Sequence, residues 1–323
     1  MLATVFAEHF GIRPSYAHAV QVGGATGLAM TMLAHHLVDA GVARHVLVVS
    51  GENRLTGQSR DASIQALAQV GHPDYEVTLG PTIPAYYGLV ASRYMHEYGV
   101  TQEDLAEFAV LMRKHALTHP GAQFHEPITV ADVMASKAGG DAVETAGLLS
   151  GVRWRRGVRR QPRTRPPRPA CGCCGCAQAH THQHVTAAPA LSELGAEIAI
   201  AKAKAASGVA ISDVRYAAVY DSFTITLAML LEDLGLAARG EAAARVRAGY
   251  FGRDGEMPLN THGGLLSYGH CGVGGAMAHL VETHLQMTGR AGSRQVRDAS
   301  IALLHGDGGV LSSHVSMFLE RVR

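Results

Sequence analysis

The chain has 323 residues, of which 47% are hydrophobic and 17% charged, and its formal net charge at pH 7 is +1. This balance gives no indication of a protein that binds nucleic acid or a charged membrane surface. No apolar run reaches the roughly 18 residues of a membrane-spanning helix, and the amino terminus lacks the pattern of a signal peptide. We therefore expect a cytoplasmic α/β protein with a large core.

Hydrophobic spacing predicts helices that alternate with short apolar strands along most of the chain. One helix start is especially clear, because Thr101 and Asp104 have the spacing of a capping box. Alternation of this kind indicates a layered α/β fold with a buried sheet. The predicted helices are 26–39, 80–98, 101–117, 191–206, 223–234 and 272–286, and the predicted strands are 46–50, 217–220, 300–304 and 310–319.

The segment 139–176 differs from the rest of the chain. Residues 151–170 carry eight arginines, four prolines and the only tryptophan, and a CGCCGC cluster follows at 171–176. It could be a basic binding loop, or a metal site made with the histidines of residues 179–184. We favour a third interpretation, a frameshift, because one choice of codons for 139–161 encodes an apolar, strand-like peptide when read one base later. We accordingly expect 151–176 to lack stable secondary structure and to bind no metal.

Four short motifs follow one another along the chain. They are VQVGGATGL at 20–28, YDSF at 220–223, NTHGGLLSYGHCGVGG at 260–275 and HGDGG at 305–309. In this order they resemble the thiolase superfamily, in particular its lipid-transfer-protein-type (SCP-x-like) thiolases and thiolase-like aldolases. The resemblance implies a thiolase fold, with two similar α/β halves that each contain a five-stranded mixed sheet.

The resemblance also implies the domain boundaries. The amino-terminal half is 1–138, the aberrant segment is 139–176, and the carboxy-terminal half is 177–323. Only 23 residues precede Gly24, so we expect the first half to be truncated, without its first strand and helix.

The first two motifs place candidate residues around a thioester. Thiolases have Cys-x-Ser-Gly-Leu in the first motif, and the matching Gly27-Leu28 puts Gly24 where the nucleophilic cysteine stands. A turn at a helix start offers backbone N–H groups to a thioester oxygen, although glycines here would also suit tight packing alone. Tyr220 matches a position that faces the thioester carbonyl. A phenol there could act as an acid or a base, or be an ordinary core residue.

The last two motifs supply histidines. His270 matches the catalytic histidine of thiolases, and Tyr268 would point the same way if the segment were extended. His305 lies nearest the second thiolase cysteine, where it either shuttles a proton or hydrogen-bonds across the glycine loop. The expected catalytic residues are His270, Tyr220, Tyr268 and His305, the expected substrate-binding residues are Gly24, Asn260, Gly264 and Gly308, and no metal ligand is expected.

A site without either thiolase cysteine suits reactions that pass through a thioester enolate. We expect a retro-aldol C–C cleavage of a β-hydroxyacyl-CoA in lipid or steroid side-chain metabolism. Two alternatives remain open, a thiolase-type acyltransferase and a non-catalytic acyl-CoA-binding scaffold. The CoA thioester would be the substrate, with no separate cofactor. The resemblance further implies a homodimer and a DUF35-type zinc-ribbon/OB-fold partner, with no nucleic acid and no membrane insertion.

Overall fold

A mixed sheet of four strands lies at the centre of the described part of the chain. The computed structural model describes residues 2–51, 68, 70–136, 138–140, 143–144, 171–270 and 272–321. The helices of eight residues or more are α1 (Leu2–His9), α2 (Thr26–Asp39), α4 (Ile83–Tyr98), α5 (Gln102–Ala116), α7 (Ala196–Ser207), α8 (Thr224–Asp233) and α10 (Gly275–Met287). The shorter helices are α6 (Val130–Met134) and α9 (Ala242–Arg247), and the strands are β1 (Ala138–Gly140), β2 (Val143–Glu144), β3 (Cys171–His180), β4 (Tyr216–Val219), β5 (Ile301–Gly308) and β6 (Ser313–Arg321).

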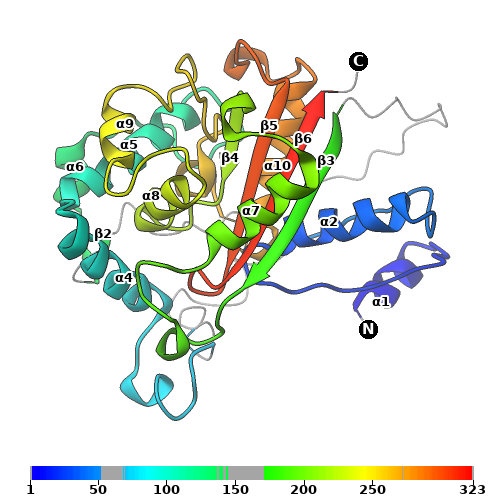
Figure 1. Cartoon of the computed structure of the whole chain (residues 1–323), viewed down its shortest axis with the longest axis horizontal. Coiled ribbons are helices and arrows are strands. Elements are labelled where there is room, and N and C mark those ends of the chain that lie inside the picture. Colours follow the sequence, from blue (N-terminus) through cyan, green and yellow to red (C-terminus); the bar gives the residue numbers. More distant parts are fainter. Residues whose placement is uncertain are drawn as a thin grey trace.

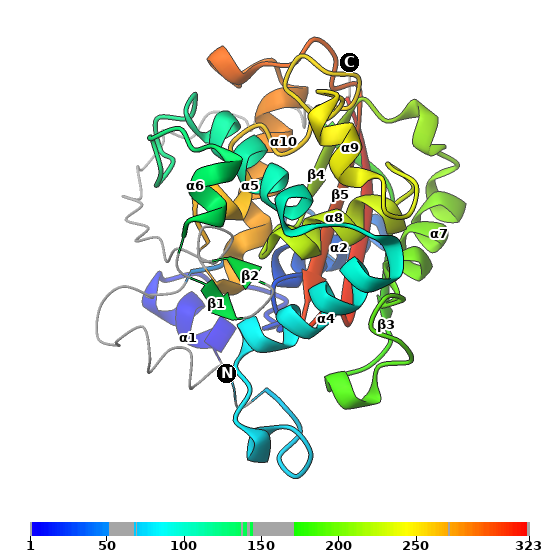
Figure 2. The same cartoon turned by 90° about the vertical axis from the view of Figure 1, so that its left-hand side faces the viewer.

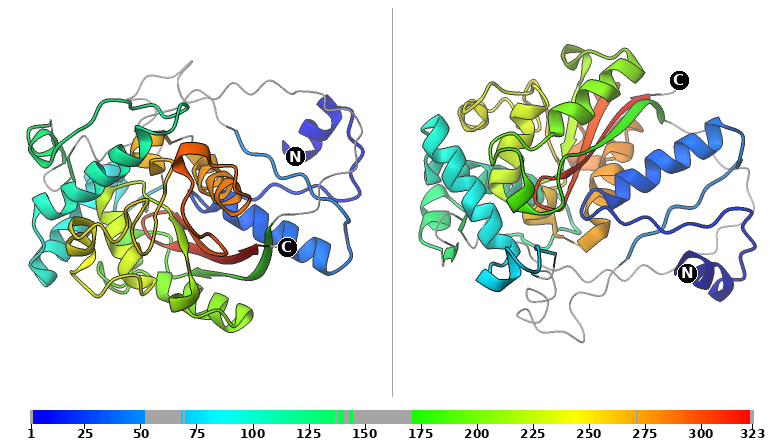
Figure 3. Two further views of the ribbon diagram at one scale, coloured as in Figure 1. Left: turned by 90° about the horizontal axis from the view of Figure 1, so that it is seen from above. Right: turned by 60° about the horizontal axis from the view of Figure 1, so that its bottom comes forward.

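The four strands have the order β3-β6-β5-β4. The pairs β3–β6 and β6–β5 are antiparallel, whereas β5 and β4 are parallel. Helices cover both faces, as expected of a sheet whose central strands are buried. Figure 3 shows α2 and α10 on one side of the sheet and α7 on the other. The predicted α/β class is confirmed, but the described sheet has four strands where five were expected.

Helices α4, α5, α6, α8 and α9 gather beside β4, at the edge of the sheet opposite β3, whereas α1 lies apart from them beyond α2 (Figures 1 and 2). Every residue of α8 is buried, because this helix lies between the sheet and the outer helices α4, α5 and α9. The capping box predicted at the start of α5 is present, since Thr101 accepts a hydrogen bond from the backbone N–H of Asp104 and the Asp104 carboxylate accepts one from Thr101. The helices predicted from periodicity are therefore found, with boundaries shifted by a few residues.

The strand predicted at 46–50 is not formed. This segment joins no strand ladder in the described residues, and Leu47 is 69% exposed. Its apolar run resembles a core strand, but a strand also needs a partner for its backbone groups. No strand lies within 2–51 or 70–136, so the first half contributes helices to the described structure.

The beginning of β3 corrects the prediction for the segment 151–176. Cys171 to Cys176 belong to β3 and pair with β6 from Arg321 to Met317, so the expected lack of secondary structure is wrong there. The strand crosses the predicted boundary at 176/177 without interruption.

Residues 145–170 lie outside the described residues, as does Cys271. In the part of the chain that the structure describes, no helix is both long and apolar enough to cross a membrane.

Candidate active site

The side chain of Tyr220 fills the space beside Gly24. Tyr220 follows the end of β4, and Gly24 lies in the turn before α2. A Cβ added to Gly24 would lie 2.0 Å from the Tyr220 hydroxyl oxygen and 2.6 Å from the carbonyl oxygen of Asp307. Since Tyr220 is only 4% exposed, the phenol cannot easily move aside. The Tyr220 hydroxyl therefore occupies the space that a side chain on residue 24 would otherwise fill.

His270 forms a hydrogen-bonded pair with this tyrosine. Its Nε2 lies 2.8 Å from the Tyr220 hydroxyl, and its Nδ1 accepts a hydrogen bond from the backbone N–H of Gly272 at 3.0 Å. A neutral imidazole has one N–H, and the Gly272 donor requires Nδ1 to be the bare nitrogen. The proton is therefore on Nε2, and His270 donates to the phenol oxygen. The pair can stabilise negative charge on that oxygen.

A buried carboxylate fixes the loop that carries His270. Asp221 accepts a hydrogen bond from the backbone N–H of Leu265 at 2.8 Å, and its Oδ1 lies 3.3 Å from Nε2 of His279. Burial raises the pKa of Asp221, and the contact with His279 opposes this shift. Gly264 has φ +59° and lies so close that an added Cβ would be 1.8 Å from Oδ2 of Asp221. Tyr220 and Asp221 are consecutive residues directly after β4. Together they fix the position of the phenol and of the loop that carries His270.

Known proteins share this arrangement of helices around the sheet. The solved Ltp2-ChsH2(DUF35) aldolase superposes with a TM-score of 0.76 at 26% identity, over 94% of this chain and 78% of that chain. The family described as "Thiolase C-terminal domain-like" matches residues 177–321. Residues 177–321 therefore belong to the thiolase superfamily, and the described fold as a whole is similar to that of a thiolase-like enzyme. The region matched by this family starts inside β3, six residues after the strand begins.

Two curated relatives show the range of this superfamily. The acetyl-CoA acetyltransferase of Methanothermobacter thermautotrophicus is 27% identical over 326 residues, which cover 97% of this chain and 83% of that protein. The steroid side-chain-cleaving aldolase of Thermomonospora curvata is 36% identical over 205 residues, or 58% of this chain and half of that protein.

His305, the other histidine predicted from the thiolase motifs, lies in the sheet core. The next residue, Gly306, faces α2 and its preceding turn, since a Cβ added there would lie 3.2 Å from Ala25 and from Leu28. Side chains alternate along a strand, so His305 points to the opposite face. There its Nδ1 is 2.8 Å from Ser316 Oγ and its Nε2 is 3.2 Å from His314 Nδ1. The structure does not bring the His305 ring together with the Tyr220–His270 pair, although its carbonyl oxygen accepts the Tyr220 N–H.

Tyr268 lies in a helical turn and not in the extended segment assumed from the sequence. Residues 264–268 form a π-helical turn, so the assumption of an extended segment is wrong and the alternation rule does not apply. The Tyr268 ring packs edge-on against His119 and His262, with centroids 4.7 Å and 5.3 Å away. The described ring contacts place Tyr268 beside these two histidines.

The remaining predicted residues are used for packing. The Asn260 amide pairs with the backbone of Val219, accepting its N–H at 2.9 Å and donating to its carbonyl at 2.7 Å. A Cβ at Gly308 would lie 2.0 Å from the carbonyl oxygen of Val22, so Gly308 packs directly on the turn that holds Gly24. Asn260, Gly264 and Gly308 thus hold the site together in this structure.

Sequence reasoning missed a second tyrosine near the site. The hydroxyl of Tyr87, on α4, donates to the Gly309 carbonyl at 3.1 Å and lies 3.4 Å from Oδ2 of Asp307. Burial raises the pKa of Asp307 well above its usual value, and the hydrogen bond from Tyr87 opposes this shift. Asp307 was visible in the HGDGG motif, where thiolases have glycine. Tyr87 carried no signal, because an apolar helix commonly contains tyrosines.

Proposed function

We propose that this chain cleaves a C–C bond of a β-hydroxyacyl-CoA by a retro-aldol reaction. The observation that carries the proposal is the position of the Tyr220 hydroxyl, beside Gly24 and 2.8 Å from His270. A thiolase reaction needs a nucleophile at the turn before α2, whereas this turn holds a hydroxyl that can transfer protons. Enolate chemistry needs a proton-transfer group and donors for the thioester oxygen, and it forms no acyl-enzyme.

The proton balance can be followed through Tyr220. As a phenolate, supported by the N–H of His270, it accepts the proton of the substrate β-hydroxyl. The Cα–Cβ bond then breaks, the β-carbon leaves as a ketone or aldehyde, and the electron pair passes to the thioester as an enolate. Backbone N–H groups at the turn before α2 stabilise the enolate oxygen. Tyr220 finally returns the proton to Cα, so the enzyme is unchanged and a shortened acyl-CoA is released.

The relatives support this choice. Both the curated protein from Thermomonospora curvata and the solved structure are named aldolases, and the former is a steroid side-chain-cleaving enzyme. We propose a substrate of the same class, an acyl-CoA with a steroid or lipid side chain. The DUF35 component of the solved aldolase suggests a DUF35-type partner for this chain as well. A cytoplasmic homodimer bound to such a partner is the assembly that we propose.

An acyltransferase is the second candidate, because the acetyl-CoA acetyltransferase relative aligns with nearly the whole chain. It would have to take its nucleophile from outside the turn at Gly24. A scaffold that binds acyl-CoA without turnover is the third candidate.

A single-turnover assay separates the three candidates. The chain, alone and with a DUF35-type partner, is mixed with a β-hydroxyacyl-CoA, and separately with a 3-ketoacyl-CoA plus free CoA. Release of ketone or aldehyde from the first substrate supports the lyase. CoA-dependent cleavage of the second would replace it with an acyltransferase, and binding without turnover would replace it with the scaffold. His270→Ala should abolish release, whereas His96→Ala, at an exposed position on α4, should not.

A further inference from the structure

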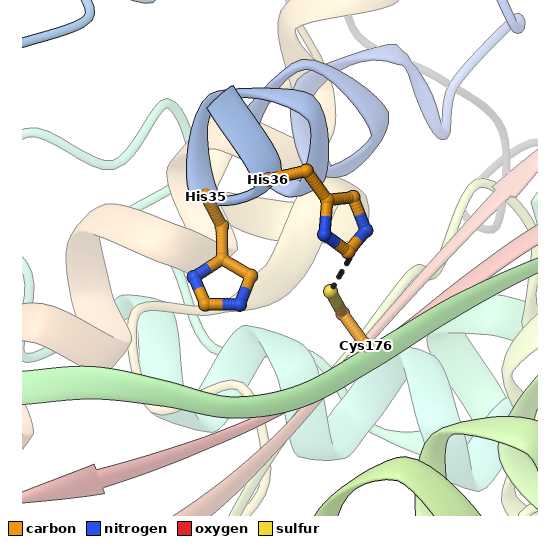
Figure 4. A group of neighbouring side chains, drawn as sticks. All are labelled: His35, His36 and Cys176. Carbon is orange, nitrogen blue, oxygen red and sulfur yellow. Dashed lines mark hydrogen bonds between the residues drawn. The ribbon is translucent and has the colours of Figure 1, made fainter. Parts of the chain in front are cut away.

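Two histidines of α2 and a cysteine of β3 form a cluster away from the candidate active site. One ligand atom from each of His35, His36 and Cys176 lies within 4.8 Å of the other two. The Cys176 Sγ is 3.9 Å from Nε2 of His36 (Figure 4). Cys176 is 9% exposed, and the two imidazoles cover it from the helix above. All three side chains can bind a metal ion.

The sheet geometry explains why the cysteine faces this helix. A Cβ added to Gly175 would lie 2.6 Å from Ser207, at the end of α7. The next residue, Cys176, must therefore point to the opposite face, which α2 covers. Histidines 140 residues earlier in the chain thus meet the cysteine only in the folded protein. The metal interpretation considered for the sequence used other histidines, those after Cys176.

A second thiol lies next to the cluster. The register of β3 against β6 is irregular between Cys173 and Gly175, so Cys174 is an extra residue in the ladder. A bulge of this kind brings residues three apart to the same side of a strand. The thiols of Cys173 and Cys176 accordingly lie on the same side of β3 and influence each other's pKa. Cys174 is directed elsewhere, and its thiol donates to the Phe318 carbonyl at 3.3 Å.

The distances suit a tetrahedral ion. Zinc binds thiolate sulfur at about 2.3 Å and imidazole nitrogen at about 2.0–2.1 Å, which holds neighbouring ligand atoms roughly 3.5 Å apart. The observed sulfur–nitrogen distance of 3.9 Å needs only a small contraction. Thiolate and imidazole ligands select ions such as zinc over magnesium or calcium.

We propose that His35, His36 and Cys176 bind a zinc-class divalent ion, and that Cys173, on the same side of β3 as Cys176, is the candidate fourth ligand. The site joins the edge strand β3 to the helix whose other end carries the Gly24 turn. Its role is structural, because Tyr220 and His270 take no part in it. A metal bound only by the folded chain would stabilise the fold by its binding free energy.

The test uses the full chain without a polyhistidine tag, since a tag would itself bind metal. Protein expressed in zinc-supplemented medium is dialysed against a weak chelator, and its metal content is measured by mass spectrometry. We expect one zinc ion per chain in the parent protein and in Cys174→Ser, the matched control. Cys176→Ser and His36→Ala should retain almost none. Loss of zinc from Cys174→Ser to the same extent, or full retention by Cys176→Ser, would overturn the proposal.

Cobalt titration of the metal-free parent protein needs no variant to fold. Thiolate ligation should produce a near-ultraviolet charge-transfer band together with the visible bands of tetrahedral cobalt, and zinc should displace both. The melting temperature should rise with added zinc in the parent protein and in Cys174→Ser alone. A cobalt spectrum of the hydrated ion, with no sulfur band, would refute the site.

Discussion

The Tyr220 hydroxyl oxygen lies 2.0 Å from the point at which a Cβ on residue 24 would stand. The turn before α2 can therefore hold this phenol or a side chain of its own, but not both. Gly24 leaves free the space that the Tyr220 hydroxyl occupies. His270 then forms a hydrogen bond with this hydroxyl.

Removal of the Tyr220 hydroxyl should stop the reaction and leave binding almost unchanged. Tyr220→Phe keeps the ring and its packing, so the loss reports the oxygen alone. We expect a rate decrease of about 10²–10³-fold or more, comparable to the loss of one oxyanion donor. Single-turnover product release and acyl-CoA binding are the measurements. The matched control is Tyr216→Phe, which removes a buried hydroxyl 3.2 Å from Thr261 but should leave the rate intact.

A methyl group at residue 24 should destabilise the protein through Tyr220. Gly24→Ala forces the phenol out of its position, and overpacking of this kind typically costs about 1–3 kcal/mol. The cost should be smaller in a Tyr220→Ala background, because the colliding ring is then absent and only the clash with the Asp307 carbonyl oxygen, at 2.6 Å, remains. Urea unfolding of the two single variants and the double variant measures this coupling. Equal costs in both backgrounds would show that the two residues do not compete for the same space.

The buried ion pair between Arg294 and Glu282 should contribute strongly to the free energy of unfolding. Arg294 donates to both carboxylate oxygens of Glu282, at 3.0 Å and 2.9 Å, and the two side chains are 9% and 2% exposed. Arg294→Ala leaves a buried carboxylate without its partner and should cost about 3–5 kcal/mol of unfolding free energy. Arg253→Ala, which breaks an exposed pair with Asp254, should leave the free energy of unfolding almost unchanged. Similar costs for both variants would contradict this reasoning.

Buried histidines should make the fold sensitive to mild acid. Burial lowers the pKa of His314 from 6.5 to about 4. Between these values the unfolded chain takes up a proton that the folded chain does not, so stability falls as the pH drops from 6.5 to 4. The difference amounts to about 3 kcal/mol for this residue. In His314→Gln, the free energy of unfolding measured with urea should change less with pH between 4 and 6.5 than in the parent protein. An unchanged slope would show that His314 does not cause this pH dependence.

Local signals predicted much of the fold. The period of apolar residues predicted helices α2, α4, α5 and α8, because each buries one face or all of its surface. The motif order correctly placed Gly24, Tyr220 and His270 together, since thiolase-type turns carry them at fixed places in the chain. The predicted strand at 46–50 failed because an apolar run cannot show whether a partner strand exists.

Side-chain directions were less predictable. His305 was assigned from its place in the HGDGG motif, but its side chain lies on the face of β5 opposite to Gly306, where it contacts Ser316 and His314. Tyr268 was assigned by alternation, which the π-helical turn at 264–268 breaks. The cluster of His36 and Cys176 depends on a contact between residues 140 positions apart, for which a single sequence holds no signal.

Asp221 ties the loop that carries His270 to the end of β4, because it accepts a hydrogen bond from the Leu265 N–H. Tyr220 and Asp221 are neighbours in the backbone, so the phenol and the loop are anchored to the same strand end. A displacement of that strand end would move the Tyr220 hydroxyl and the Leu265 N–H in the same direction. The distance between the Tyr220 hydroxyl and Nε2 of His270 is therefore governed mainly by one short stretch of backbone.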